Sequence, residues 1–255
     1  MFTPFEDATA EPAIRGFLHL PASSVAGEPA EASGDGIVLT HGAGANCQSK
    51  LLVAVSDALA ATGFTVLRFD LPFRLARPYG PPRPGSAERD RQGLRRAALL
   101  LRSQLSQNSP KPAAAISQRP HMQNRHVGHP DPAAARVFLG GHSYGGRQAS
   151  ILLAEDPSVA DGLFLLSYPL HPPKKPTELR TKHFPQLVKP AFLVHGTRDP
   201  FATIAELQST LALIPARHAL LEVDGAAHDL LPPKSASDLP TRVAREFLAF
   251  VGTAF

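Results

Sequence analysis

The segment Gly-His-Ser-Tyr-Gly at residues 141–145 has the spacing of a serine nucleophile motif. In G-x-S-x-G, Ser143 occupies a sharp turn between a strand and a helix, and the flanking glycines leave room where side chains would collide with neighbouring backbone. An apolar run at 136–139 and a helical pattern at 146–155 predict the strand and the helix that this turn requires. The pattern indicates a catalytic nucleophile, with a simple tight turn as the structural alternative.

A serine hydroxyl is a weak nucleophile at neutral pH, so it needs a histidine base that is oriented by a carboxylate. Asp199 follows an apolar run at 191–194, and His228 follows the next run at 219–223. Because both would lie on strand-end loops in the order Ser, Asp, His, we expect Asp199 to be the acid and His228 the base. An Asp-Pro turn and a capping histidine are the alternatives. Two neighbouring acidic residues are weaker candidates for the acid, Asp224 and Asp229.

Small residues fill the segment 40–46, Thr-His-Gly-Ala-Gly-Ala-Asn, between an apolar run and a helical pattern. Acyl transfer creates an oxyanion, and rigidly held backbone N–H groups stabilise it without reorganisation. We expect the amides of Ala43 and Tyr144 to form this oxyanion hole, while Gly42 and Gly44 let the backbone approach the substrate. A phosphate-binding turn is the alternative, but neither Gly-Lys-Ser/Thr nor G-x-G-x-x-G is present.

Short apolar runs separated by helical patterns recur along the chain, as in sheets of buried parallel strands. Seven runs predict strands, at residues 14–20, 36–40, 64–69, 136–139, 162–167, 191–194 and 219–223. Apolar stripes predict amphipathic helices, at Leu51, Leu52, Val55, Leu59 and Ala60, at Leu94, Ala98, Leu101 and Leu105, and at Val243, Phe247 and Val251. This alternation predicts a single α/β domain over residues 1–255, with a mostly parallel sheet of about seven strands and helices on both faces.

Two segments interrupt the alternation and are predicted to be surface loops. Residues 74–85 are rich in Pro, Arg and Gly, and residues 106–132 are rich in Ser, Gln, Asn, Pro and His. We interpret 106–132 as a polar insertion and expect it to be the most mobile or protease-sensitive part of the chain. Its histidines have no adjacent carboxylate pair, so no metal site is predicted at His121, His126 and His129. The connection from 167 to 191 is too short for a helical cap domain, which predicts an open, shallow site.

The composition excludes several classes of protein. The formal charge of +4 suggests a nucleic-acid partner, but many arginines fall between residues 74 and 102, and no zinc-finger spacing or sustained basic tract accompanies them. We therefore expect a solvated basic face and no nucleic-acid partner. The lone Cys47 favours a reducing compartment, and neither a signal sequence nor an uncharged apolar run of roughly 20 residues is found. A cytoplasmic protein without membrane attachment is expected.

Six segments of the chain together resemble the α/β hydrolases, and among them the small, lidless, dienelactone-hydrolase-like branch. They are GIVLTHGAGAN, FTVLRFDLPFR, GGHSYGGRQAS, LLSYPLHPPKKP, FLVHGTRDPF and GAAHDL. The resemblance covers most of the chain and implies the α/β-hydrolase fold without a cap, a triad of Ser143, Asp199 and His228, and an oxyanion loop at 41–44. Dienelactone hydrolase itself uses cysteine at the nucleophile position, so lactone opening of that type is not expected here.

The expected activity is hydrolysis of small or short-acyl carboxylic esters through an acyl-enzyme, without a cofactor or a metal ion. The candidate substrate-binding side chains are Phe73, Tyr168 and Phe201, and the remaining candidate wall residues are Tyr79, Tyr144 and His171. Arg74 and Arg147 could bind an acidic substrate group, although a surface or capping role is favoured. A thioesterase, a peptidase and a non-catalytic hydrolase-like interaction protein remain as alternatives, the last because one relative in the branch is chromatin-associated. A monomer or homodimer is expected.

Overall fold

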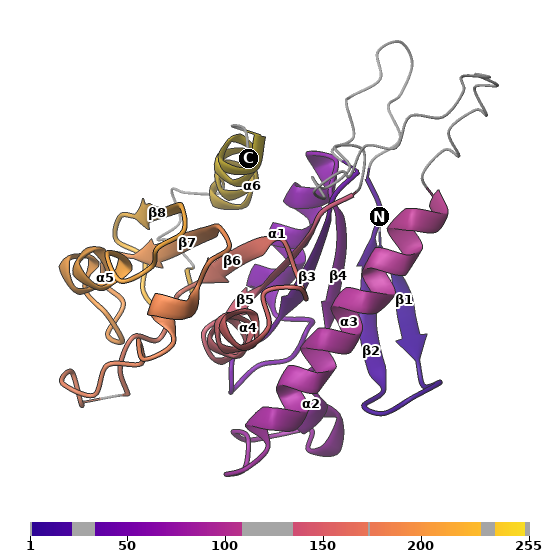
Figure 1. Ribbon diagram of the computed structural model, residues 1–255, viewed down its shortest axis with the longest axis horizontal. Helices are drawn as coiled ribbons and strands as arrows, with labels where there is room; N and C mark the ends of the chain where they lie inside the picture. Colours follow the sequence, from indigo (N-terminus) through magenta and orange to yellow (C-terminus); the bar gives the residue numbers. More distant parts are fainter. Residues whose placement is uncertain (1, 22–33, 109–134, 173, 231–237, 253–255) are drawn as a thin grey trace, which may run out of the picture.

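One sheet of eight strands organises the part of the chain that the computed structural model describes, residues 2–21, 34–108, 135–172, 174–230 and 238–252 (Figure 1). The strands are β1 (Phe2–Asp7), β2 (Ile14–His19), β3 (Gly36–Thr40), β4 (Thr65–Phe69), β5 (Val137–His142), β6 (Gly162–Leu166), β7 (Ala191–Gly196) and β8 (His218–Val223). Their order in the sheet is β1-β2-β4-β3-β5-β6-β7-β8. The pairs β1–β2 and β2–β4 are antiparallel and all the others are parallel, so the predicted mostly parallel sheet is confirmed.

Strand β1 was not predicted from the sequence and adds one strand to the expected number. Its residues, Phe-Thr-Pro-Phe-Glu-Asp, are mostly exposed and carry neither a buried apolar run nor a strict alternation. Pro4 lacks a donor for a ladder hydrogen bond, which an edge strand tolerates and a central strand does not. Pairing with β2 over its whole length therefore forms this strand, and its own sequence contributes little to it.

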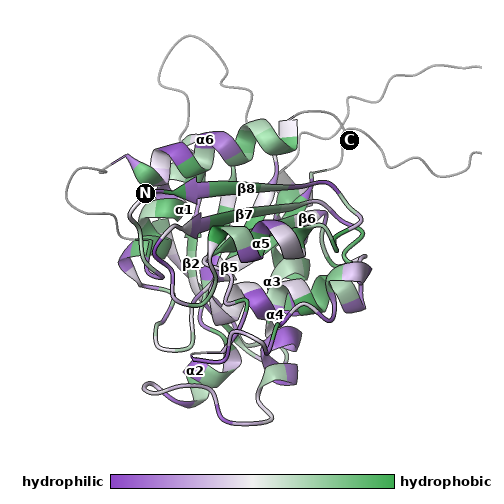
Figure 2. Cartoon of the chain, turned by 90° about the vertical axis from the view of Figure 1, so that its left-hand side faces the viewer, coloured by the Kyte–Doolittle hydropathy of each residue, from purple (hydrophilic) through white to green (hydrophobic). Residues whose placement is uncertain are grey.

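Helices cover both faces of the sheet, as predicted. On one face α1 (Lys50–Ala61) packs against α6 (Leu239–Gly252), and on the other lie α3 (Ala87–Asn108), α4 (Tyr144–Glu155) and α5 (Ile204–Leu211). Figure 2 shows the apolar strands β7 and β8 between α6 and α5. The predicted apolar stripes are all buried, and all their residues except Ala60 belong to one or other of these two cores. Because strands β3 to β8 run parallel to one another, their carboxyl ends lie at one common edge of the sheet.

The two predicted surface loops require corrections at their starts. Residues 74–76 belong to a short helix, α2 (Pro72–Ala76), and Arg74 is only 6% exposed, because its guanidinium is hydrogen-bonded to backbone carbonyls. Residues 106–108 form the last turn of α3, since Leu105 continues the buried stripe to that point. The rest of the predicted insertion, residues 109–132, lies outside the described residues, as do its three histidines.

The basic face of α3 is largely neutralised by ion pairs. Its arginines contact carboxylates from four other parts of the chain, in the pairs Arg89–Glu11, Arg91–Glu155, Arg95–Asp156, Arg96–Asp7 and Arg102–Asp161. Exposed pairs of this kind contribute about 0–1 kcal/mol each, so they orient the helix more than they stabilise it.

The connection between β6 and β7 contains only the short 3₁₀ helix η1 (Phe184–Gln186) in its described residues. The expectation of a fold without a cap domain agrees with this connection. No described helix is both long enough and apolar enough to cross a bilayer.

Candidate active site

Ser143 lies at the sharp turn between β5 and α4, with φ 52° and ψ −115°. A residue other than glycine rarely adopts a positive φ, and backbone strain of this kind is commonly found at functional sites. A Cβ atom added to Gly145 would lie 2.6 Å from Thr40 Cγ2, and one added to Gly141 would lie 2.6 Å from the Thr40 carbonyl oxygen. The predicted reason for both glycines is thus confirmed, because β3 passes too close to this turn for any larger residue.

Three side chains from distant parts of the chain form a hydrogen-bonded series at the turn. His228 Nε2 lies 2.8 Å from Ser143 Oγ, and His228 Nδ1 lies 2.8 Å from Asp199 Oδ2. An ionised carboxylate only accepts hydrogen bonds, so Nδ1 carries the proton and Nε2 accepts from the serine hydroxyl. The structure therefore brings together the three residues that the sequence motifs single out, in the geometry of a nucleophile, a base and an orienting acid.

The loops after β7 and β8 are joined to each other by backbone hydrogen bonds, which fixes the acid relative to the histidine. The N–H of Arg198 donates to the carbonyl of Ala226 over 2.9 Å, and Gly196 allows this approach because a Cβ there would lie 2.2 Å from the same oxygen. The weaker acid candidate Asp224 accepts a hydrogen bond from the Thr197 hydroxyl. Asp224 is thus engaged by Thr197, and Asp199 is the carboxylate that contacts His228.

Asp199 has a fully buried side chain, and its two oxygens have separate partners. Burial alone raises its pKa, but the hydrogen bond and charge of His228, together with the N–H of Phe201, outweigh burial and bring the pKa below its usual value. The carboxylate is thus ionised at neutral pH. His195 lies 3.6 Å away and donates from Nε2 to the carbonyl of Ala202, which fixes its own tautomer.

His142, the residue before the serine, was not identified from the sequence as part of the site. Its Nε2–H donates to the carbonyl oxygen of His228 over 2.7 Å. Burial lowers the pKa of His142 to about 4, so the ring is neutral at physiological pH. The contact holds the backbone that carries His228. No sequence signal predicts it, because the variable position of G-x-S-x-G accepts many residue types.

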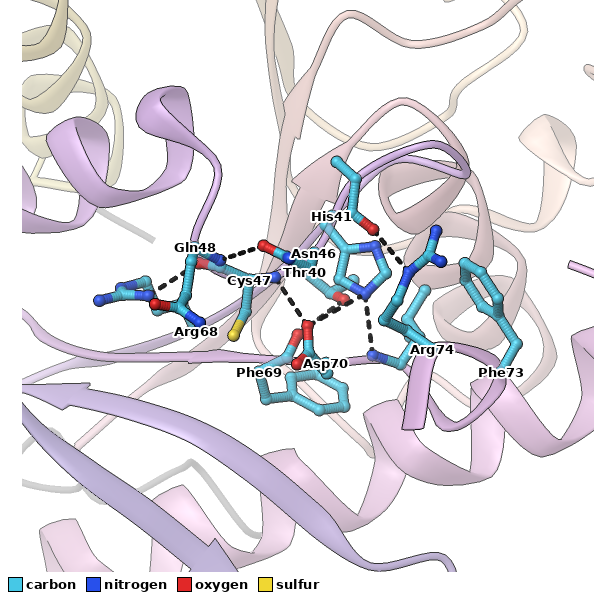
Figure 3. A network of polar contacts seen from close by, with 12 residues as sticks. Thr40, His41, Asn46, Cys47, Gln48, Arg68, Phe69, Asp70, Phe73 and Arg74 are labelled. Carbon is cyan, nitrogen blue, oxygen red and sulfur yellow. Dashed lines mark hydrogen bonds and ion pairs between the residues drawn. The ribbon is translucent and has the colours of Figure 1, made fainter. Parts of the chain in front are cut away.

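The loop after β3 is oriented by His41, which Figure 3 shows between this loop and Arg74. His41 Nε2 accepts from the N–H of Leu71 over 3.1 Å, so Nδ1 carries the proton and donates to the carbonyl of Gly42 over 2.9 Å. Burial lowers the pKa of His41 and keeps it neutral. The Gly42 carbonyl also accepts from the N–H of Ala45. Because a trans peptide is planar, fixing this carbonyl points the N–H of Ala43 the opposite way.

Asp90, on α3, is a second residue of the site that sequence analysis missed. Its buried carboxylate accepts from the Tyr144 hydroxyl over 2.7 Å and from the N–H of Phe73 over 2.9 Å. Burial raises the pKa of Asp90. The phenol ring of Tyr144 packs edge-on against Phe73, with centroids 5.6 Å apart. Asp90 thereby fixes the side chain of Tyr144 and the start of α2 beside the turn.

The predicted substrate-contacting residues differ in their surroundings. Phe201 packs against the ring of His228, with centroids 4.3 Å apart, and Gly42 approaches the serine so closely that an added Cβ would lie 3.4 Å from Ser143 Cβ. Phe73 lines two surface hollows of about 180 and 340 Å³. Gly44 is exposed and has open space where a Cβ would be. These positions are compatible with the predicted roles.

Three other wall candidates, and Arg147 as a candidate for binding an acidic group, have no described contact with the serine. Tyr168 is buried, its hydroxyl donates to the Arg180 carbonyl and its ring packs on Phe184, so its side chain belongs to the core. Tyr79 is 85% exposed. His171 is buried beside its neighbour Pro172. Arg147 lines a separate hollow of about 380 Å³ beside η1. Tyr168 in particular was wrongly predicted as a substrate contact, because aromatic character alone does not distinguish core from site.

Among the described residues no cluster of three or more His, Cys, Asp or Glu side chains is arranged to hold a metal ion. The single cysteine, Cys47, is buried, and burial raises the pKa of its thiol to about 12.

Residues 100–251 match a protein family described as an alpha/beta hydrolase domain. The fold is similar to that of dienelactone hydrolase from Anabaena variabilis, with a TM-score of 0.65 and 17% identity over 98% of this chain and 97% of that one. A lidless α/β serine hydrolase from Xanthomonas campestris gives a TM-score of 0.66 and 14% identity over 100% and 96%. Est1E from Butyrivibrio proteoclasticus gives 0.65 and 14% over 98% and 99%. At these identities the three structures show a shared fold.

Proposed function

Because the chain belongs to the α/β-hydrolase family, we propose that it is a serine hydrolase that cleaves small carboxylic esters through an acyl-enzyme. The observation that carries this proposal is the unbroken series of hydrogen bonds from Asp199 through His228 to Ser143. A histidine with only a structural role does not need a serine hydroxyl as its partner. A nucleophilic serine, by contrast, needs both a base beside it and an exposed position at a strained turn.

In the proposed first half-reaction, His228 Nε2 takes the proton of Ser143 as Oγ attacks the carbonyl carbon of the ester. The Oγ–C bond forms, and the carbonyl π electrons move to the oxygen. The resulting oxyanion accepts hydrogen bonds from the N–H groups of Tyr144 and Ala43. When the intermediate collapses, the C–O bond to the alcohol breaks and the imidazolium returns its proton to the leaving oxygen. The product is an acyl-serine and a free alcohol.

In the second half-reaction, water attacks the acyl carbon while His228 accepts its proton, and the same steps in reverse release the acid. Asp199 keeps the proton of the neutral imidazole on Nδ1 and stabilises the imidazolium during both halves. The ionised state of Asp199 at neutral pH supports this role. No cofactor is needed, because the side chains supply the nucleophile and every proton transfer.

The proposed substrates are esters with short acyl groups. Support comes from the short described connection between β6 and β7, which supplies no helical cap to enclose a long chain. The core position of Tyr168 removes one apolar wall that the sequence suggested.

Replacement of the nucleophile tests this function. We expect Ser143→Ala to hydrolyse p-nitrophenyl acetate no faster than the buffer does, while its circular dichroism and melting temperature match the wild type. A panel that also contains a thioester and an anilide of the same acyl group would identify the preferred leaving group. Wild-type turnover by Ser143→Ala would eliminate the proposed nucleophile.

A further inference from the structure

Arg74 is a buried cation whose hydrogen-bond partners are all backbone carbonyls, and its guanidinium also lies 4.9 Å from the centroid of the Phe73 ring. Its Nε donates to Ala45 over 2.8 Å, and one terminal nitrogen donates to Ala43 over 2.8 Å and to Gly80 over 3.1 Å. The other terminal nitrogen donates to Arg77 over 3.1 Å. Within the part of the chain that the structure describes, no carboxylate forms an ion pair with it. The guanidinium thus joins the loop after β3 to the turn after α2.

Burial of a charge without a counter-ion is unfavourable unless its hydrogen-bonding groups are satisfied. A guanidinium carries five N–H donors in a rigid plane, so it can bind two loops at once, whereas an ammonium group is a single compact donor on a flexible stem. Four carbonyl contacts therefore give Arg74 a defined geometry. Stability alone does not explain this choice, since apolar side chains of similar size often pack as well as buried charged ones.

The contacts of Arg74 lie on the segment that is proposed to bind the oxyanion. His41 and the N–H of Ala45 hold the carbonyl of Gly42, and Arg74 holds the carbonyl of Ala43. The two peptide planes that meet at Ala43 are thus both anchored through their oxygens. Since each plane is rigid, the direction of the Ala43 N–H is fixed before substrate binds. The buried positive charge also favours negative charge that develops nearby.

We propose that Arg74 is a positioning residue for the oxyanion hole, which it keeps preorganised by tying the Ala43–Ala45 backbone to the turn at residues 77–80. The inference rests on the proposed serine hydrolase function. It predicts that loss of Arg74 weakens binding of the transition state and leaves binding of the ground-state ester nearly unchanged. Arg74 would then act on kcat, although its own side chain never touches the substrate.

Arg74→Ala and Arg74→Lys test this role by steady-state hydrolysis of p-nitrophenyl acetate. We expect Arg74→Ala to lower kcat by about 10- to 100-fold, less than the roughly 100- to 1000-fold cost of losing an oxyanion donor outright because the Ala43 N–H is misplaced and not removed, with KM changed by less than about threefold. Arg74→Lys should recover only part of kcat, because its ammonium group cannot bind both loops. Millimolar guanidinium, which can fill the vacated position, should raise kcat of Arg74→Ala in a saturable way. If Arg74→Ala does not fold, the kcat of Arg74→Lys alone tests the proposal, and a wild-type value contradicts it.

Arg136→Ala is the matched control. Arg136 is a partly buried arginine at the start of β5, remote from the strand ends that carry Ser143, and it also donates to a backbone carbonyl, that of Val251. Its loss should lower the melting temperature and leave kcat and the response to guanidinium at wild-type levels. Wild-type kcat in both Arg74 variants, or a loss of kcat in Arg136→Ala as large as in Arg74→Ala, would overturn the proposal.

Labelling of the wild type by a fluorophosphonate separates the two proposals. A wild type that is not labelled contradicts the serine hydrolase function itself. A wild type that is labelled, with Arg74→Ala labelled at the same rate, contradicts only the positioning role of Arg74. We expect wild-type labelling at Ser143 and a rate for Arg74→Ala that is reduced in parallel with kcat.

Discussion

At Asp199 two opposing effects meet on one carboxylate. Burial disfavours its charge, while His228 and the N–H of Phe201 favour it, and the second effect is larger because the charge of His228 adds to the two hydrogen bonds. At Asp90 the result is the opposite. The hydrogen bonds from the Tyr144 hydroxyl and the Phe73 N–H do not compensate for burial, so the pKa of Asp90 is raised. Two buried carboxylates close to one turn thus differ in charge preference, according to the donors that each one has.

Asp199→Asn should leave the fold intact and lower kcat on p-nitrophenyl acetate by about 100-fold or more, because an amide no longer selects the Nδ1–H tautomer of His228. KM should change little. Asp224→Asn is the matched control, since Asp224 contacts Thr197 and not the histidine. If Asp224→Asn were the damaging change and Asp199→Asn were harmless, the acid would be wrongly assigned.

The sequence predicted Ser143, Asp199 and His228 because each follows an apolar run within a few residues, so local spacing is enough to find it. It did not predict Asp90, nor the contact of Arg74 with the loop after β3, because their partners lie 54 and 31 residues away and become neighbours only when α2 and α3 pack beside the turn. Tyr168 was misjudged for the same reason. Its position in the core depends on Phe184 and Arg180, which the sequence near Tyr168 does not reveal.

The site depends on the close approach of helix α4 to strand β3. Gly145, in the first turn of α4, has no side chain, so the backbone of β3 and the loop after it can pass directly beside Ser143, and Gly146 likewise lets the helix approach the Gly141 carbonyl of β5. Strands β3 and β5 are also hydrogen-bonded neighbours in the sheet. Their register places the turn at Ser143 beside the carboxyl end of β3. The motif predicted this packing, whereas the edge strand β1 could not be predicted because its partner β2 forms it.

Gly145→Ala should destabilise the fold by about 1–3 kcal/mol, the usual cost of overpacking, because the new methyl group would lie 2.6 Å from Thr40 Cγ2 and 2.7 Å from the His41 carbonyl. Gly44→Ala is the matched control for stability, since no atom lies within 4 Å of its added Cβ. Urea unfolding of the two variants measures the difference. Equal midpoints would show that β3 and α4 are less closely packed than described.

Over the whole molecule, several histidines are buried in the neutral state, and this links stability to pH. Burial lowers the pKa of both His142 and His183 to about 4, with Arg147 adding to the effect at His183. In the unfolded chain both return to about 6.5. Between these values the unfolded state binds more protons than the folded state, so stability must rise with pH there.

We expect the free energy of unfolding to be highest above pH 6.5 and to fall as the pH is lowered toward 4, each of the two histidines contributing a slope of up to about 1.4 kcal/mol per pH unit. Urea unfolding at a series of pH values measures this slope. His183→Gln should reduce this slope by the contribution of one histidine. A pH-independent free energy between 6.5 and 4, or a variant with the wild-type slope, would show that these rings are not held neutral.

The shape of the molecule around the site sets the expected substrate size. With only η1 in the described connection between β6 and β7, strand-end loops must form the acyl pocket, so a long chain gains little of the roughly 0.8 kcal/mol available per buried methylene. We expect kcat/KM on p-nitrophenyl esters to peak between acetate and butyrate and to fall at octanoate. An optimum at dodecanoate would show a deep apolar pocket that this account lacks.

The central claim is that Ser143 is an activated nucleophile, and covalent labelling measures this directly. A fluorophosphonate probe should modify the wild type at one site, which peptide mass spectrometry should locate at Ser143, and His228→Gln should be labelled at least about 100-fold more slowly because the base is lost. The other hydroxyl groups of the chain should stay unmodified. A wild type that remains unlabelled, or a label on any residue other than Ser143, would contradict the account.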